Sequence, residues 1–339
     1  MTARAHRPTI KEVAQHAGVS PMTVSRTLSG GLNVKPDVQE RVLAAVAELG
    51  YHRNENARSI RPGHSSGLIG IAITNIANPY YSTFALGVEE EAALTGRRIL
   101  LGNTSEDAVR ENALVSDFLG RRVEGLVVVP ASNVPEHLAD AQRQGVPVVQ
   151  ASRRIDGLDA DSVVLADEEG AQRGATALLD AGHTRIGYLG NTLSIFTGQR
   201  RHAGFVRAFD ERGIPIDQDI VAAGQQTVDQ AREATRAMLQ MKNPPTALFC
   251  ANNRNAIGAL KEINRQLSTG LRPASDYPEI MSFDDFELAE LSPVPISVID
   301  HDPRELGRTA ARLLLDRLDA DGGAVREVEL PVELRMHLR

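Results

Sequence analysis

Residues 9–30, TIKEVAQHAGVSPMTVSRTLSG, predict two short helices joined by a tight turn. Thr9 and Glu12 have the spacing of a capping box, in which each side chain accepts a hydrogen bond from the other residue's backbone N–H. Apolar residues follow at i, i+3, i+4 and i+7, so one face of this helix is apolar. Gly18 is placed to end the helix, because glycine readily adopts the left-handed conformation of a helix stop.

The second helix of this stretch is short and keeps one polar face. Ser20 is placed to cap it, and Pro21 occupies its first position. Val24 and Leu28 lie on one side of the helix. The residues that point away from this apolar side are Met22, Thr23 and Arg26.

A third helix is predicted from Pro36, where the sequence runs PDVQERVLAAVAELG and ends at Gly50. Three short helices with a glycine-containing turn between the first two are typical of a helix-turn-helix unit. The second helix of such a unit leaves one face free to enter the major groove of DNA. The alternative is a plain three-helix bundle that binds nothing.

Composition excludes several classes of protein. The chain has 339 residues, enough for two or three compact units. Its single cysteine excludes a disulfide framework and a multi-cysteine metal site, and it agrees with a reducing compartment. No apolar run approaches the roughly 18 residues that a membrane span needs, and no charged-then-apolar leader opens the sequence. We therefore expect a cytoplasmic protein with no membrane contact.

Charge is distributed unevenly along the chain. Residues 1–66 contain nine Lys and Arg against five Asp and Glu, although the whole chain has a net charge of -7. A basic head on an acidic body suggests that only the head meets a polyanion. The alternative is a solvated surface with an uneven charge.

From Gly67 onward, short β-branched runs alternate with helical patterns, which predicts an α/β body with parallel sheets. The rhythm restarts after about residue 162, so we expect two similar lobes. Ligands of such folds bind beyond the carboxyl ends of the strands, here in a cleft between the lobes. The expected strands are GLIGIAIT, RRILLGNT, VEGLVVVP and VPVVQAS, then SVVLA, TRIGYLG, DIVAAG, TALFCAN and EIMSFDD.

The stretch 9–30 resembles the opening of the lactose-repressor/galactose-repressor (LacI/GalR) family, bacterial transcription regulators that respond to small molecules. The resemblance continues through residues 40–71 and on to the C-terminus. It implies a helix-turn-helix head over residues 1–53, a hinge over 54–63 and a periplasmic-binding-protein-like body over 64–339. Within the body it implies a first lobe of about 64–161 and 294–322, and a second lobe of about 162–293 and 323–339.

By this resemblance the second helix reads DNA. The implied base contacts are Pro21, Met22 and Arg26, and the implied phosphate contacts are Ser20, Thr23 and Ser25. Arginine can bond a guanine edge bidentately, and the two apolar side chains can contact a thymine methyl group. Many relatives carry a polar residue in place of Met22, which leaves hydrogen-bonded readout at that base open.

In the family, the hinge forms a helix only when two protomers lie side by side on the operator. Ile60 stands where relatives place a leucine wedge that enters the minor groove and kinks the DNA. The alternative is a linker residue that packs on the body. The resemblance thus implies a homodimer on double-stranded, pseudo-palindromic operator DNA.

Several polar and aromatic residues match positions that line the family's effector cleft. Each of them taken alone is equally compatible with a loop or a helix cap, but together they follow the ends of strands and favour a site. The implied effector-binding residues are Tyr80, Tyr81, Ser152, Arg153, Arg201, Asn252 and Asp284.

Two departures from the family pattern concern the charge of the effector. Ser152 and Asn253 stand where relatives often have aspartate. Arg153, Arg200, Arg201 and Arg254 lie nearby, so we expect an anionic effector such as a sugar acid or a phosphorylated sugar. Asp284 argues the other way, and a neutral sugar is the alternative.

The resulting prediction is a repressor whose operator affinity is controlled by a sugar or sugar acid. No acid/base or nucleophile cluster, cofactor motif or metal-spaced His/Cys set appears, so we expect neither catalysis nor a cofactor. The alternatives are an enzyme on a doubly wound fold and a secreted solute-binding protein.

Overall fold

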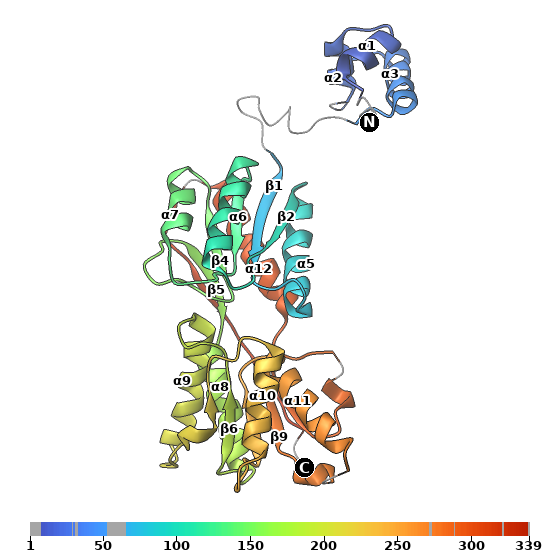
Figure 1. Ribbon diagram of the computed structural model, residues 1–339. Helices are drawn as coiled ribbons and strands as arrows, with labels where there is room; N and C mark the ends of the chain where they lie inside the picture. Colours follow the sequence, from blue (N-terminus) through green and yellow to red (C-terminus); the bar gives the residue numbers. More distant parts are fainter. Residues whose placement is uncertain are drawn as a thin grey trace. The chain divides into compact units, whose positions relative to one another are not determined.

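The computed structural model describes residues 8–28, 30, 33–52, 66–270, 273–287, 289–320 and 322–337. The chain divides into two compact units, Met1–Ser66 and Gly67–Arg339, and each is described by itself (Figure 1). The predicted hinge, 54–63, and its proposed wedge Ile60 lie outside the described residues. In the part of the chain that the structure describes, no helix has both the length and the apolarity to cross a membrane.

The head contains three helices, α1 (Ile10–His16), α2 (Pro21–Thr27) and α3 (Pro36–Leu49). The predicted capping box is present, with the backbone N–H of Thr9 donating to Glu12 at 2.7 Å and that of Glu12 donating to Thr9 at 3.4 Å. Gly18 and Gly50 have the positive φ of helix stops, at 66° and 60°. The local signals therefore specify these helices as predicted.

A small apolar cluster holds the three helices together. Val13 and Ala14 from α1, Val24 from α2, and Val42 and Ala45 from α3 are buried in it. This leaves the opposite face of α2 free of packing.

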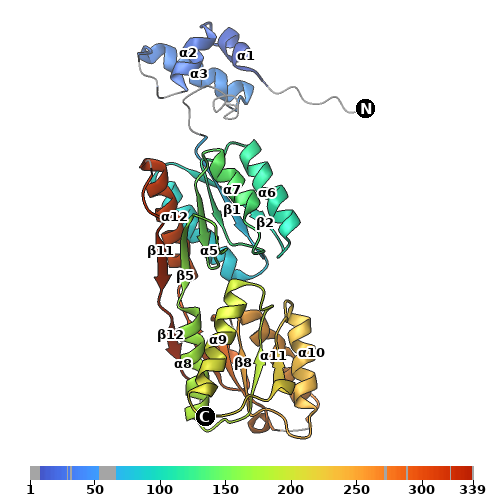
Figure 2. The same ribbon diagram turned by 90° about the vertical axis from the view of Figure 1, so that its left-hand side faces the viewer.

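The body consists of two lobes, each built on a six-stranded sheet (Figures 1 and 2). The first sheet has the order β11-β5-β4-β3-β1-β2, and the second has the order β12-β10-β9-β8-β6-β7. All pairs are parallel except β10 with β12, which is antiparallel. Parallel sheets covered by helices on both faces agree with the predicted α/β architecture.

The strands and helices of the first lobe come from two parts of the chain. They are β1 (Leu68–Ile73), α5 (Pro79–Leu94), β2 (Arg98–Asn103), α6 (Ala108–Gly120), β3 (Gly125–Val128), α7 (Glu136–Arg143), β4 (Val148–Ala151), β5 (Asp161–Leu165), α12 (Pro303–Asp319) and β11 (Glu327–Leu330).

The second lobe contains the remaining elements. They are α8 (Asp167–Asp180), β6 (Ile186–Leu189), α9 (Phe196–Asp210), β7 (Val221–Ala222), α10 (Val228–Leu239), β8 (Ala247–Cys250), α11 (Asn253–Leu267), β9 (Glu279–Phe283), β10 (Ile296–Asp300) and β12 (Glu333–Arg335), with short 3-10 helices at Gln218–Ile220, Ala274–Asp276 and Ala289–Leu291.

The lobe boundaries differ from those implied by the resemblance. β5 pairs with β4 and therefore completes the first sheet, although the resemblance places 162–293 in the second lobe. β10 belongs to the second sheet, although 294–322 is expected in the first, and β11 belongs to the first sheet, although 323–339 is expected in the second. Of these three strands, β5 lies where the sequence predicts one, at SVVLA. Periodicity identifies a strand but not the sheet that it joins. The chain crosses between the lobes three times, each time directly after one of these three strands.

Helices α5 and α12 of the first lobe pack unusually closely. A Cβ on Gly87 of α5 would overlap the carbonyl oxygen of Arg304, and a Cβ on Gly307 of α12 would overlap that of Phe84. Glycine at these two positions thus allows the helix backbones to touch. Arg304 also forms an ion pair with Glu90 across the same contact.

We expect Gly87→Ala to destabilise the body by about 1–3 kcal/mol, because the added methyl group meets backbone that cannot rotate away. Gly120→Ala is the matched control: this glycine also lies in a helix, and a Cβ added to it would have nothing within 4 Å. Urea unfolding of both variants measures the difference. Equal unfolding midpoints would contradict the close-packing interpretation.

Candidate functional site

The exposed face of α2 is positioned by its N-terminus. The Ser20 hydroxyl accepts the backbone N–H of Thr23 at 3.1 Å, and Pro21 stands at the first helical position. Pro21, Met22 and Arg26 are exposed, with 65% of Met22 accessible, whereas Val24 is buried. The three predicted base contacts therefore share one free face. The predicted phosphate contacts Thr23 and Ser25 are half-buried at its edge, and Ser20 is exposed.

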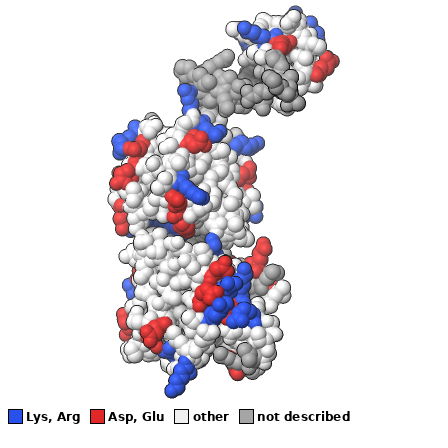
Figure 3. All heavy atoms as spheres, viewed as in Figure 1, with Lys and Arg blue, Asp and Glu red and all other residues white. Residues whose placement is uncertain are grey.

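Charge on the described head is balanced. Its Lys and Arg residues are Lys11, Arg26, Lys35 and Arg41, and its acids are Glu12, Asp37, Glu40 and Glu48. The positive excess of residues 1–66 thus comes from the sequence on either side of the three helices. On the body, acidic and basic side chains are intermingled over the face shown in Figure 3, with no extended patch of one sign.

A pocket lies between the two lobes of the body, beyond the carboxyl ends of their strands. Asn78, Glu106, Thr197, Gly198, Asn253 and Arg254 are among its lining residues. All seven predicted effector-binding residues line this pocket, namely Tyr80, Tyr81, Ser152, Arg153, Arg201, Asn252 and Asp284.

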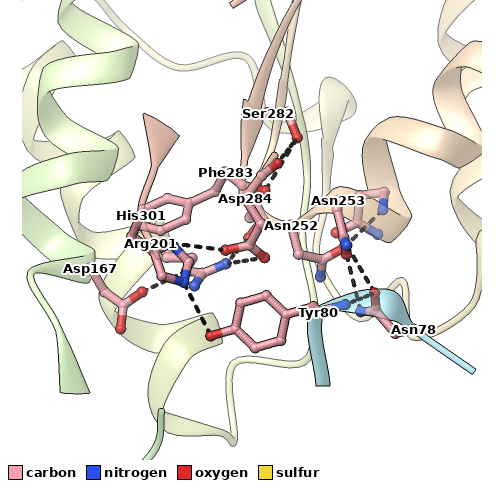
Figure 4. A network of polar contacts seen from close by, with 12 residues as sticks. Asn78, Tyr80, Asp167, Arg201, Asn252, Asn253, Ser282, Phe283, Asp284 and His301 are labelled. Atoms are coloured by element: carbon pink, nitrogen blue, oxygen red, sulfur yellow. Dashed lines mark hydrogen bonds and ion pairs between the residues drawn. The ribbon is translucent and has the colours of Figure 1, made fainter. Parts of the chain in front are cut away.

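Arg201 is the centre of a buried polar network (Figure 4). Its Nε donates to Asp167 at 2.7 Å, and one terminal nitrogen donates to Asp284 at 3.3 Å and to the carbonyl of Ala251 at 2.7 Å. The guanidinium also lies 3.6 Å from the ring centroid of Phe283. Burial alone would lower the pKa of Arg201, but the two carboxylates raise it above its ordinary value, so the side chain stays charged.

Arg153 is neutralised within the first lobe. Its two terminal nitrogens donate to the two carboxylate oxygens of Glu106, at 2.6 and 2.9 Å. One of them also donates to the carbonyl of Pro130 at 3.1 Å. This bidentate pair leaves little of the Arg153 charge for a ligand.

A contact between His301 and Tyr80 links the first lobe to one of the chain crossings. The Nε2 atom of His301, on the crossing between β10 and α12, lies 3.2 Å from the Tyr80 hydroxyl. Burial lowers the pKa of His301 to about 4, so the imidazole is neutral. Its Nδ1 lies 3.9 Å from Asp284, beyond hydrogen-bond distance.

An amide pair joins the lobes at another place in the pocket. Asn78, the N-cap of α5, and Asn253, the first residue of α11, each donate an amide N–H to the other's carbonyl oxygen, at 3.3 and 3.0 Å (Figure 4). The neighbouring Asn252 caps α11 through its side-chain oxygen, which accepts from the N–H of Asn255 at 2.8 Å. Asn252 therefore both caps α11 and lines the pocket.

Backbone strain marks the same site. Ser152 and Asp284, directly after β4 and β9, have φ values of 62° and 67°. Ser105 and Glu106 have φ values of 55° and 61°. Non-glycine residues with this left-handed backbone are uncommon and often occur at ligand sites.

The structure removes one arginine from the predicted cationic cleft and adds three residues to the site. Arg200 is absent from the pocket lining and forms an ion pair with Glu168 at 2.9 Å, so it does not contribute to the expected cationic cleft. The added residues are Glu106, Asp167 and His301. Only their position after or near strand ends could have indicated them.

One carboxylate oxygen in the pocket lacks a donor. Asp284 is 7% exposed, and its Oδ1 accepts no hydrogen bond from any described residue. A buried acceptor without a donor costs about 1–3 kcal/mol, which a ligand hydroxyl or N–H would offset. Among the described residues, no group of three or more His, Cys, Asp or Glu is arranged to hold a metal ion.

We expect Asp167→Asn to change the pH dependence of stability. Burial raises the pKa of Asp167 to about 6, although Arg201 opposes the shift. Because the folded state binds this proton more tightly than the unfolded state, protonation of Asp167 stabilises the fold. This stabilisation is fully present below the unfolded-state pKa of 3.8 and is lost as the pH rises through about 6. The variant lacks this loss, so its stability relative to wild type should rise by up to about 3 kcal/mol between about pH 4 and about pH 7.5. Denaturant unfolding at both pH values tests this, and a constant difference would contradict it.

Comparison with known proteins agrees with this architecture. Residues 66–337 match the family model for periplasmic binding proteins and the sugar binding domain of the LacI family. Residues 9–54 match the model for bacterial regulatory proteins of the lacI family.

Individual relatives match over nearly the whole chain. The HTH-type transcriptional repressor PurR of Aliivibrio salmonicida (strain LFI1238) is 32% identical over 91% of this chain and 92% of its own. The lac repressor dimer bound to operator and the anti-inducer ONPF is 27% identical, with a TM-score of 0.82 over 97% of this chain and 98% of its own. The transcriptional regulator CelR in complex with cellobiose is 25% identical, with a TM-score of 0.71 over 97% and 99%. The chain therefore belongs to the LacI family of bacterial regulatory proteins, which are DNA-binding transcription regulators and not enzymes.

Proposed function

We propose that this regulator is a repressor that binds a polyhydroxylated small molecule, a sugar or sugar acid, between its two lobes. The observation that carries the proposal is the buried Oδ1 of Asp284, which lines the pocket and lacks a donor. A sugar hydroxyl is a donor of the right kind, and it can accept from a neighbouring amide at the same time.

Uncharged polar side chains of the pocket support the same class of ligand. The amides of Asn75, Asn191 and Gln226 line it beside the residues already described. The half-buried ring of Tyr80 offers an apolar surface for one face of a sugar ring. The sugar-binding domain of the matching family model and the cellobiose complex of CelR agree with this class.

Ligand binding would alter DNA binding by changing how the lobes close. In our proposal, Pro21, Met22 and Arg26 contact bases, while Ser20, Thr23 and Ser25 contact phosphates. The head, 1–53, and the hinge, 54–63, act in a cytoplasmic homodimer, as in the lac repressor dimer on its operator. An extracytoplasmic solute-binding protein would not need the DNA-reading head that residues 9–54 match.

We expect Arg26→Ala to weaken operator binding by about 1–3 kcal/mol per half-site and to relax selectivity at one base pair, because the bidentate contact to a base is lost. Arg26→Lys is the control, since it keeps the charge but not the planar fork of donors. Binding sequences selected from a random DNA pool, then varied one base pair at a time, provide the measurement. An equal loss at every base pair in both variants would show that Arg26 contacts only phosphate.

We expect Asp284→Asn to weaken effector binding by about tenfold or more, because the pocket loses its charged acceptor. Asp285→Asn is the matched control, since Asp285 is adjacent and carries the same charge but does not line this pocket. Thermal-shift screening of sugars and sugar acids, followed by calorimetry, measures both variants. If no sugar or sugar acid raises the melting temperature of the wild-type protein, the proposed ligand class is wrong.

A further inference from the structure

Four arginines are expected to make the cleft cationic, and the structure separates one of them from the others. Arg153 and Arg201 are paired with carboxylates, and Arg200 pairs with Glu168 away from the pocket lining. Arg254, near the start of α11, lines the pocket and is half-buried. In the described part of the chain, no hydrogen-bond or ion-pair partner of its guanidinium is found, so its charge is not compensated.

Three helix N-termini add partial positive charge beside that of Arg254. First-turn residues of α5, α9 and α11 line the pocket, and none of these helices has Asp or Glu in its first turn. The other helices of the two lobes, α6, α7, α8, α10 and α12, each carry at least one acid there. Each helix N-terminus carries a partial positive charge of roughly half a unit, which a first-turn acid would offset.

The start of α9 is especially open to a ligand. Its N-cap, Ile195, makes no side-chain cap, while Thr197 and Gly198 of its first turn line the pocket. The first backbone N–H groups of a helix have no partner within the helix, so they are donors for whatever occupies the pocket.

The acids of this region are bound to arginines other than Arg254, although Arg201 binds two carboxylates, Asp167 and Asp284, so that its network carries one negative charge in excess. Glu106 is bound to Arg153, and Asp284 is bound to Arg201 through its Oδ2. The remaining Oδ1 of Asp284 is buried and without a donor, so the ligand must bring a hydroxyl or N–H to that point. The pocket is thus matched to a ligand with a hydroxyl at one place and a negative charge at another.

We propose that the effector carries one anionic group, a carboxylate or a phosphate, which Arg254 binds. This inference rests on the proposed function, because it assigns the charge of the ligand that the pocket takes. Arg254 and the N-termini of α9 and α11 would hold the anion, while Asp284 accepts a hydroxyl of the same molecule. The effector is then a sugar acid or a sugar phosphate and not a neutral sugar.

The test compares neutral sugars with their charged derivatives. Glucose, galactose, mannose and ribose are each titrated into the full-length protein together with their uronic acids, which keep the sugar ring, and their terminal phosphate esters. For the sugar that binds, we expect the acid or the ester to bind about tenfold or more tightly than the neutral form. If the acid binds more tightly than the ester, the anionic group is a carboxylate; if the ester binds more tightly, it is a phosphate.

Variants identify the residue responsible. Arg254→Gln should reduce the preference for the charged form to about twofold or less, because it weakens binding of the charged form much more than binding of the neutral form. Arg200→Gln is the matched control, since it removes an arginine of the same lobe that does not line the pocket, and it should preserve the preference. Melting temperature and effector-free operator binding of both variants check that the fold is intact.

The outcomes separate this inference from the proposed function. If a neutral sugar binds as tightly as its charged forms, the inference fails, whereas sugar binding that Asp284→Asn weakens leaves the proposed function intact. If the preference persists in Arg254→Gln, the anion is bound by another group, and the assignment to Arg254 fails. If no member of the panel binds, the proposed sugar class is wrong, and this inference falls with it.

Discussion

The buried guanidinium of Arg201 is the interaction on which the effector pocket depends. It fixes the start of α8 through Asp167, the turn after β9 through Asp284, and the turn after β8 through the carbonyl of Ala251. A buried charge is expensive to desolvate, and apolar residues of equal volume often stabilise a protein as well as a buried ion pair does. The network therefore serves geometry: it sets the direction of the Asp284 carboxylate and holds the strained backbone at that residue.

The lobes are held together by few polar contacts, and this makes closure sensitive to a ligand. Besides the three chain crossings, the reciprocal amide pair of Asn78 and Asn253 joins the lobes. The side chain of Asn133 also donates to the carbonyl of Ser194 at 2.6 Å. Each such bond contributes only about 0.5–1.5 kcal/mol net. A ligand that donates to Asp284 in one lobe and contacts the other lobe adds interactions of similar size, so it can shift the balance between open and closed forms.

The sequence allowed the local structure to be predicted because its signals are local. The Thr9–Glu12 capping box and the Ser20 cap concern residues three apart, and both are present as expected. The seven predicted effector-binding positions were implied by the family resemblance, and the carboxyl ends of parallel strands, which meet at one edge of a sheet, agree with them. All seven line the pocket.

Partners far apart in the sequence could not be predicted in this way. Arg153 forms an ion pair with Glu106, 47 residues away in the sequence, and Arg201 forms one with Asp284, 83 residues away. The expectation of an anionic effector took four arginines without these acids, and of the four only Arg254 still supports it. The assignment of β5, β10 and β11 to sheets failed for the same reason, because strand pairing is a long-range property.

The route from the pocket to the head begins in the covalent chain. Ser66 ends the first compact unit, and β1 starts at Leu68, so the linker enters the body directly into a central strand of the first sheet. That strand continues into Thr74, which lines the pocket, and the chain then reaches Asn78, the N-cap of α5 and one half of the amide pair. Because a packed strand moves as a rigid element, a shift of the first lobe against the second displaces the start of β1 together with its pocket end. The closure that our proposed function requires would thus displace the start of β1 without any change of fold between it and the pocket.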